Sequence, residues 1–142
     1  MRLNKEEIRK LIQEPYFSRG EKYFKGGMIK IIAMSEDSVK ARAVGSCVYN
    51  IKLTIKSSKL NGTCSCPAFY DYGPCKHMAA VGLAAIEYVR GKFYKLNEKY
   101  VDQVDEFESF EKFLNGKTKK ELVGLIVEMS GLYPEIIADF YE

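Results

Sequence analysis

The spacing of apolar positions predicts two short helices at the start of the chain. Asn4 and Glu7 form a candidate capping box, an apolar stripe follows at helical spacing, and Pro15 ends this first helix. Ser18 is the candidate N-cap of a second helix, and Gly26-Gly27 provides its stop.

From residue 28 the apolar pattern changes to a period of two, which is typical of strands with one buried face. The alternating residues are Ile29, Ile31 and Ala33, then Val39, Ala41 and Ala43, then Cys47, Tyr49, Ile51, Leu53 and Ile55. Turn signals at Glu36-Asp37 and Gly45-Ser46 separate the three runs and predict a three-stranded antiparallel meander. Asn61-Gly62 is read as a further turn that leads into a cysteine-rich segment.

The helical period returns after His77 in the run MAAVGLAAIEYVR, with Gly91 as its expected C-cap. Beyond residue 99 apolar residues again fall at helical spacing, and Thr118 and Glu121 form another capping box. A helical tail with a buried face is therefore expected. The fold class is α+β: the meander and the cysteine-rich hairpin-to-helix segment, flanked by N-terminal helices and the helical tail.

The distribution of charged residues also changes near residue 99, where the helical tail is expected to begin. Residues 1–99 carry 18 Lys and Arg against 9 Asp and Glu, a net charge of +9, whereas residues 100–142 carry 4 against 10, a net charge of −6. We therefore predict a basic domain over 1–99 and an acidic tail over 100–142, with an anionic partner for the basic domain or a tail that screens it.

No apolar run approaches the roughly 20 residues that a membrane span needs, and the polar N-terminus does not resemble a signal peptide. The sequence predicts a cytoplasmic protein with no membrane partner. In a reducing compartment, four cysteines are explained better by metal binding or core packing than by disulfides.

Three of the four cysteines cluster beside the only histidine, as Cys64, Cys66, Cys75 and His77. The pattern is C-x-C, eight residues, C-x-H, and structural zinc takes four such ligands in a tetrahedron. Residues two apart on an extended strand point the same way, so Cys64 and Cys66 can form one pair of ligands. Residues two apart on a helix diverge by about 200°, so Cys75 is expected in the turn before a helix and His77 in its first turn.

This C-x-C and C-x-H-x-x-A arrangement, with Ala80 as its last residue, resembles the SWIM zinc-finger family. Further likeness lies in Arg19-Gly20, Tyr23, Gly27, Val44-Gly45-Ser46, Tyr49, Ser65, Pro67 and Lys76, so the resemblance spans roughly residues 18–90. It implies a zinc module that binds DNA or protein partners, as in Mutator-type transposases, chromatin remodellers and accessory factors of recombinases. The chain carries no transposase or helicase domain.

Basic side chains are expected on the meander face opposite the apolar one. We predict that Lys40, Arg42, Lys52, Lys56, Lys59 and Lys76 contact nucleic acid phosphates. The alternative is that the strand residues among them are the solvated side of a half-buried sheet. Phe69, Tyr70 and Tyr72 in the loop between the ligand pairs either stack on a partner or cover the metal site.

Two functions follow from these observations. The first is a non-catalytic module, held by one structural Zn²⁺, that binds nucleic acid, with DNA favoured, through its basic surface. The second is a protein-interaction adaptor, of which a recombinase accessory factor is one form. An enzyme is not expected, because four protein ligands leave no open position on zinc and no acid–base pair is visible. No small-molecule substrate is expected either.

Overall fold

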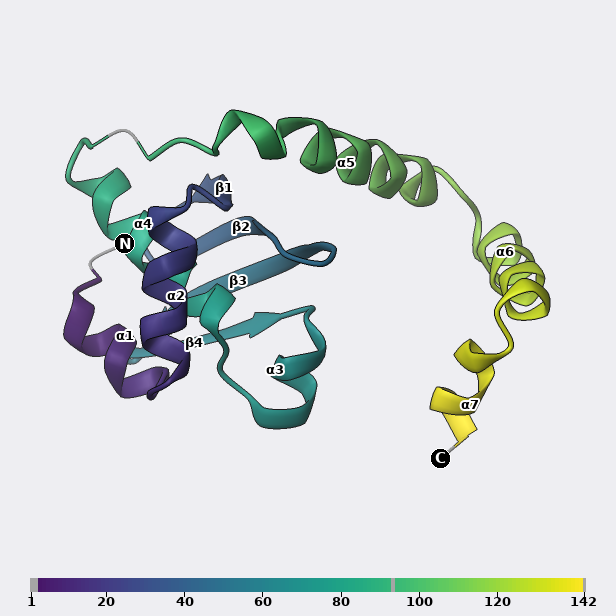
Figure 1. Cartoon of the computed structure of the whole chain (residues 1–142), viewed down its shortest axis with the longest axis horizontal. Coiled ribbons are helices and arrows are strands. Elements are labelled where there is room, and N and C mark those ends of the chain that lie inside the picture. Colours follow the sequence, from purple (N-terminus) through teal and green to yellow (C-terminus); the bar gives the residue numbers. More distant parts are fainter. Residues whose placement is uncertain (1–2, 93, 142) are drawn as a thin grey trace. The chain divides into compact units, whose positions relative to one another are not determined.

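A four-stranded antiparallel sheet organises the first part of the chain (Figure 1). The structure, a computed structural model, describes residues 3–92 and 94–141. The strands pair in sequence order and are β1 (Ile29–Met34), β2 (Ser38–Val44), β3 (Val48–Lys56) and β4 (Lys59–Cys64). The α+β class is confirmed, with one strand more than the three that the apolar pattern predicted.

The fourth strand exists because the turn after β3 comes earlier than expected. Ser57 and Ser58 have φ of 48° and 61°, so a two-residue turn with two left-handed residues joins Lys56 to its direct partner Lys59. The prediction of a turn at Asn61-Gly62 is wrong, because both residues lie inside β4. A Cβ on Gly62 would lie 2.6 Å from Leu53 Cδ2, so this glycine serves close packing.

Helices cover one face of the sheet. α4 (Lys76–Val89) contacts all four strands, and α2 (Tyr16–Lys25) packs on α4, in front of the sheet in Figure 1. α1 (Lys5–Leu11) also contacts α4. Every residue of α4 from His77 to Ile86 is buried, which explains why its sequence is apolar on all sides.

The starts of the two N-terminal helices differ from each other in how they are capped. The capping box of α1 forms as predicted, since the Asn4 side chain accepts from the Glu7 backbone and Glu7 accepts in return. The prediction of Ser18 as an N-cap is wrong: α2 begins directly after Pro15, whose ring suits the start of a helix. The Glu14 carboxylate accepts from the Ser18 backbone N–H instead.

Cys47 was expected on the apolar face of a strand but is exposed in the turn before β3. Val48 is the first residue of β3 and is buried. Cys47 therefore lies outside the core and outside the cysteine cluster.

The tail is helical, as predicted. After η1 (Glu98–Tyr100) come α5 (Val101–Asn115), α6 (Lys119–Leu132) with the Thr118–Glu121 capping box in place, and α7 (Glu135–Tyr141). The contacts separate a unit Met1–Val104 from a unit Asp105–Glu142, inside α5, while the boundary drawn from charge at residue 99 stays a prediction. None of the described helices is long and apolar enough to span a membrane.

The expected buried face of the tail is absent from the second unit itself. Phe110 and Phe113 stack on each other with ring centroids 6.4 Å apart, yet both remain about half exposed. Across residues 105–138, no described side chain is buried.

Candidate metal centre

Two cysteines reach the site from the end of β4. Cys64 is the last residue of β4 and pairs with Ile51, and Cys66 is the N-cap of the short helix α3 (Pro67–Tyr72). Between them, Ser65 is tied to β3: its N–H donates to the Asn50 carbonyl at 3.0 Å, and its Oγ accepts from the Asn50 N–H at 2.9 Å. These two bonds hold the C-x-C segment against the sheet, a role of Ser65 and Asn50 that the ligand spacing does not reveal.

The other two candidate ligands come from the start of α4. Cys75 is its N-cap, with extended φ and ψ of −118° and 171°, and His77 lies in the first helical turn. This is the arrangement predicted from the C-x-H spacing. Because Cys75 lies outside the helix and His77 inside it, two residues that would diverge on a regular helix both face the cysteine pair.

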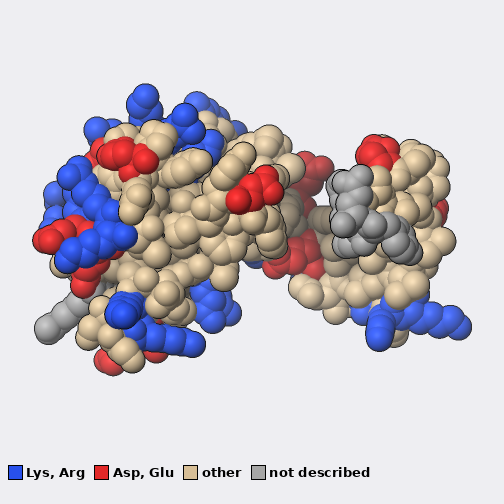
Figure 2. Space-filling view, turned by 90° about the horizontal axis from the view of Figure 1, so that it is seen from below, with Lys and Arg blue, Asp and Glu red and all other residues tan. Residues whose placement is uncertain are grey.

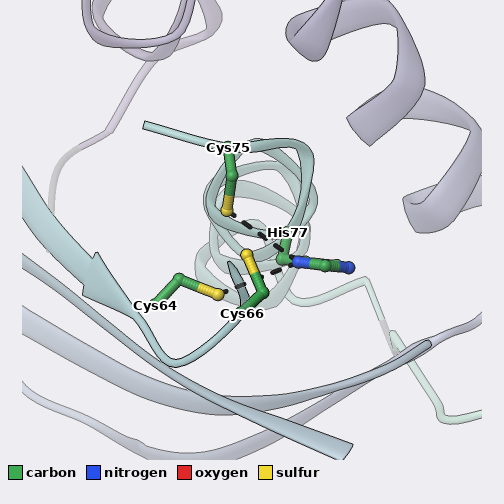
Figure 3. Close-up of side chains that lie close together, drawn as sticks. All are labelled: Cys64, Cys66, Cys75 and His77. Carbon is green, nitrogen blue, oxygen red and sulfur yellow. Dashed lines mark hydrogen bonds between the residues drawn. The ribbon is translucent and has the colours of Figure 1, made fainter. Parts of the chain in front are cut away.

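The four side chains converge on one point (Figure 3). His77 Nδ1 lies 3.8 Å from Cys64 Sγ and 3.9 Å from Cys75 Sγ, and all four ligand atoms lie within 4.8 Å of one another. Around a tetrahedral zinc with Zn–S near 2.3 Å and Zn–N near 2.0–2.1 Å, ligand atoms are about 3.5–3.8 Å apart. The cluster therefore has the size that one zinc ion needs.

The electrostatics of the cluster concentrate negative charge on one sulfur. A hydrogen bond from the Cys64 thiol, together with the nearby His77, lowers the pKa of Cys75 to about 4. The same hydrogen bond and burial raise the pKa of Cys64, and burial raises the pKa of Cys66. Cys75 thus favours the thiolate form, next to the buried thiols of Cys64 and Cys66. A divalent cation bound between them would offset the free-energy cost of burying further negative charge when these thiols ionise.

Aromatic rings surround the imidazole of His77, which is only 4% exposed. The rings of Tyr23 and Tyr49 lie 5.0 and 4.9 Å from it, centroid to centroid. A Cβ on Gly45 would lie 2.9 Å from Tyr49 Cε2 and 3.6 Å from His77 Nε2, so this glycine leaves the room that the imidazole and Tyr49 occupy. The packing fixes the ring with Nδ1 toward the sulfurs.

His77 Nε2 is buried, and the described residues offer it no hydrogen-bond partner. Ligation of a metal through Nδ1 places the ring proton on Nε2, away from the cluster. The donor set of three sulfurs and one imidazole nitrogen matches a closed structural zinc site.

Five of the six predicted nucleic-acid-binding residues share one face of the sheet, which we call the basic strip: Lys40, Arg42, Lys52, Lys56 and Lys59. Lys40 lies directly opposite Lys52, and Lys56 lies directly opposite Lys59. The Arg42 guanidinium donates to the Asn50 side chain on the neighbouring strand. Lys30, opposite Arg42, extends the strip onto β1 and was missed from the sequence.

The sixth residue, Lys76, lies elsewhere. It is the first residue of α4, and its ammonium group is 4.6 Å from the centre of the Tyr23 ring of α2. Since α4 and α2 cover the opposite face of the sheet, the structure does not bring Lys76 together with the basic strip.

The three aromatic residues expected in a loop between the ligand pairs lie in α3 and differ in exposure. Phe69 is partly buried and packs against the core, whereas Tyr70 and Tyr72 are 76% and 74% exposed. Phe69 therefore fits the covering role, and the two tyrosines are open to a partner.

The strand end, short helix, turn and helix around a buried Cys3His cluster define a zinc-finger module, a class of binding domain. Residues 49–86 match the SWIM zinc finger family, so the chain contains a SWIM zinc finger whose four clustered residues fit one structural zinc ion. Neither the comparison with curated proteins nor that with solved structures gives a match.

Proposed function

We propose that this protein is a non-catalytic module that binds nucleic acid, DNA in the first instance, through the basic strip. Zinc holds the end of β4 to the start of α4 and so keeps the sheet in place under the strip. Four protein ligands leave zinc no open position for a reacting water, which supports a binding role.

The observation that carries the proposal is the direct apposition of like charges across the strands. In the strand register Lys40 lies directly opposite Lys52, and Lys56 lies directly opposite Lys59. Like charges directly opposite each other on antiparallel strands are destabilising, so the arrangement is unfavourable until an anion lies over it. A phosphate backbone supplies a row of such anions.

The composition of the strands supports the same conclusion. None of the four strands contains an Asp or Glu, and the segment 29–64 carries its carboxylates only in the β1–β2 turn, at Glu36 and Asp37. A solvated sheet face with no binding role commonly mixes both signs. In the view of Figure 2, lysine and arginine side chains surround much of the first unit.

The function as a protein-interaction adaptor, including a recombinase accessory factor, rests on different residues. Tyr70 and Tyr72 are exposed on α3, between the ligand pairs, and exposed tyrosines are typical of protein interfaces. This function predicts little affinity for DNA at physiological salt and a partner whose binding is lost when both tyrosines are changed to alanine.

We also propose a cytoplasmic location, because Cys47, Cys64, Cys66 and Cys75 form no disulfide in the described part of the chain. An oxidising compartment favours disulfides between neighbouring cysteines and so competes with zinc.

The test is the affinity of the zinc-loaded protein for a labelled duplex and a labelled single strand over a salt series. We expect binding that weakens steeply with salt, because each neutralised phosphate of a duplex contributes a slope of roughly −0.9 in log K against log[salt]. The double variant Lys40→Glu/Lys52→Glu is expected to weaken binding at least about tenfold and to reduce the slope by roughly 2.

The matched control is Lys22→Glu/Lys25→Glu, which changes the net charge equally on exposed positions of α2, on the helical side of the sheet. This control is expected to retain most of the affinity. Equal losses in the two double variants would mean that only net charge matters, and the absence of binding at low salt would favour the adaptor function.

A further inference from the structure

The second unit exposes an apolar stripe on α6. Val123, Ile126 and Val127 stand at helical spacing i, i+3 and i+4, so they share one side of the helix, and they are 51%, 57% and 64% exposed. Leu122 and Leu125, which point elsewhere, are only half-buried. A helix that is apolar on several sides is normally covered by other elements, which the described second unit does not provide for this stripe.

The size of the unit Asp105–Glu142 makes this exposure important. Domains below roughly 40 residues rarely bury enough apolar surface to fold without a metal, a disulfide or a partner. None of the described side chains of this unit is buried, and its helices leave the stripe exposed. In Figure 2, the visible surface of this unit is largely uncharged.

Two glycines beside the stripe point to a close neighbour. Gly124 and Gly131 are seven residues apart and lie on one side of α6 next to Val127. A Cβ added to either would meet nothing within 4 Å, so the chain itself gives no reason for glycine there. Glycine inside a helix costs about 1 kcal/mol relative to alanine, and a second backbone approaching this side explains why it is tolerated.

The charges of α6 indicate which neighbour fits. Lys119 and Lys120 outnumber the single acidic residue Glu121 in the first turn, where the helix dipole is positive, and the last turn carries no basic residue to balance its negative end. An antiparallel copy of α6 corrects both mismatches at once, because each pair of lysines then meets the negative end of the other helix. A parallel copy leaves both uncorrected.

We infer that α6 pairs with α6 of a second copy of this chain, antiparallel and about a two-fold axis, through Val123, Ile126 and Val127 with Gly124 and Gly131 at the close approach. Such an isologous contact presents the same surface from both chains. The inference is independent of the nucleic-acid function and adds a dimerisation surface in the acidic tail.

The test is the mass of the zinc-loaded full chain by light scattering and sedimentation, from about 1 µM to about 100 µM. We expect a dimer that dissociates on dilution, and Val127→Asp is expected to raise its dissociation constant at least about tenfold with zinc content and helicity unchanged. Val89→Asp is the matched control: Val89 is also an exposed valine on a helix, in the first unit, and its change is expected to leave the dimer intact.

Two more variants separate a helix pair from a local effect on α6. In an isolated helix Gly124→Ala stabilises, whereas in the pair it blocks the close approach and weakens the dimer. Likewise Lys119→Glu/Lys120→Glu suits the dipole of its own helix but repels the negative end of the partner helix, and is expected to weaken the dimer.

A wild-type chain that stays monomeric over the whole range would overturn the inference, and so would a dimer insensitive to Val127→Asp. Both outcomes leave the nucleic-acid proposal untouched, because that proposal is tested with residues of the sheet.

Discussion

Gly20 of α2 and Ala79 of α4 meet at the crossing of these two helices. A Cβ on Gly20 would lie 2.5 Å from Ala79 Cβ and 2.7 Å from the Lys76 carbonyl oxygen. Real Cβ atoms do not approach other heavy atoms so closely, so only glycine allows α2 to rest on α4 at this point. Since α4 carries Cys75 and His77 at its start, the contact supports the helix that presents half of the metal centre.

We expect Gly20→Ala to destabilise the zinc-loaded protein by about 1–3 kcal/mol, because the added methyl group forces α2 away from α4. Denaturant unfolding followed by circular dichroism measures the change. Ser18→Ala, at an exposed position of the same helix, is the control and is expected to change the stability by less than about 0.5 kcal/mol. Similar stabilities for the two variants would contradict the tight crossing.

Loss of one candidate ligand is expected to cost the protein its zinc. Cys66→Ala leaves three donors, so the metal content falls well below one ion per chain and the melting temperature falls by more than about 10 °C. Metal analysis and thermal unfolding measure the two quantities, and chelation of the wild type is expected to give the same melting temperature. Cys47→Ala, at the exposed cysteine, is expected to keep both zinc and stability.

Acid is expected to release the zinc before it unfolds the rest of the domain. Zinc binds cysteine as thiolate, and the raised pKa values of Cys64 and Cys66 mean that protons compete strongly for these sulfurs. Falling pH therefore weakens zinc binding, by at least about tenfold per pH unit below neutrality, and rising pH strengthens it. Competition with a zinc indicator at several pH values measures this, and an affinity independent of pH would exclude thiolate ligation.

A substitution in the turn between β3 and β4 is expected to stabilise the protein. Ser58 has a φ of 61°, a left-handed conformation that glycine adopts more readily than serine. We expect Ser58→Gly to stabilise the protein by about 0.5–1 kcal/mol in denaturant unfolding, with the register Lys56 opposite Lys59 unchanged. Thr54→Gly, in the middle of the same strand pair, is expected to have the opposite sign.

Local structure could be predicted from the sequence where it depends on neighbours along the chain. The Asn4 and Thr118 capping boxes formed as predicted because each joins residues three apart. The metal centre could be predicted for the same reason: within each ligand pair the residues are two apart, and their chemistry specifies zinc.

Local signals predicted the wrong structure where tertiary packing or a nearby proline favoured another one. Asn61-Gly62 is a strong turn signal, yet packing of Leu53 against Gly62 places these residues in a strand and moves the turn to two serines. Ser18 followed by Glu21 reads as a capping box, but Pro15 already begins the helix. Tertiary packing and proline geometry outweighed intrinsic preference in these cases.

By itself, then, the sequence determined the four candidate zinc ligands that cluster in the structure, the α+β class and the alternation that places Lys40 and Lys52 on one side of their strands. Only the tertiary structure decided that Lys40 lies opposite Lys52, that Lys76 lies on the other side of the sheet, and that the described helices of its own unit leave the stripe on α6 uncovered. The physical reason is that strand register and burial depend on contacts between residues far apart in the chain, which no local pattern of apolar and polar positions specifies.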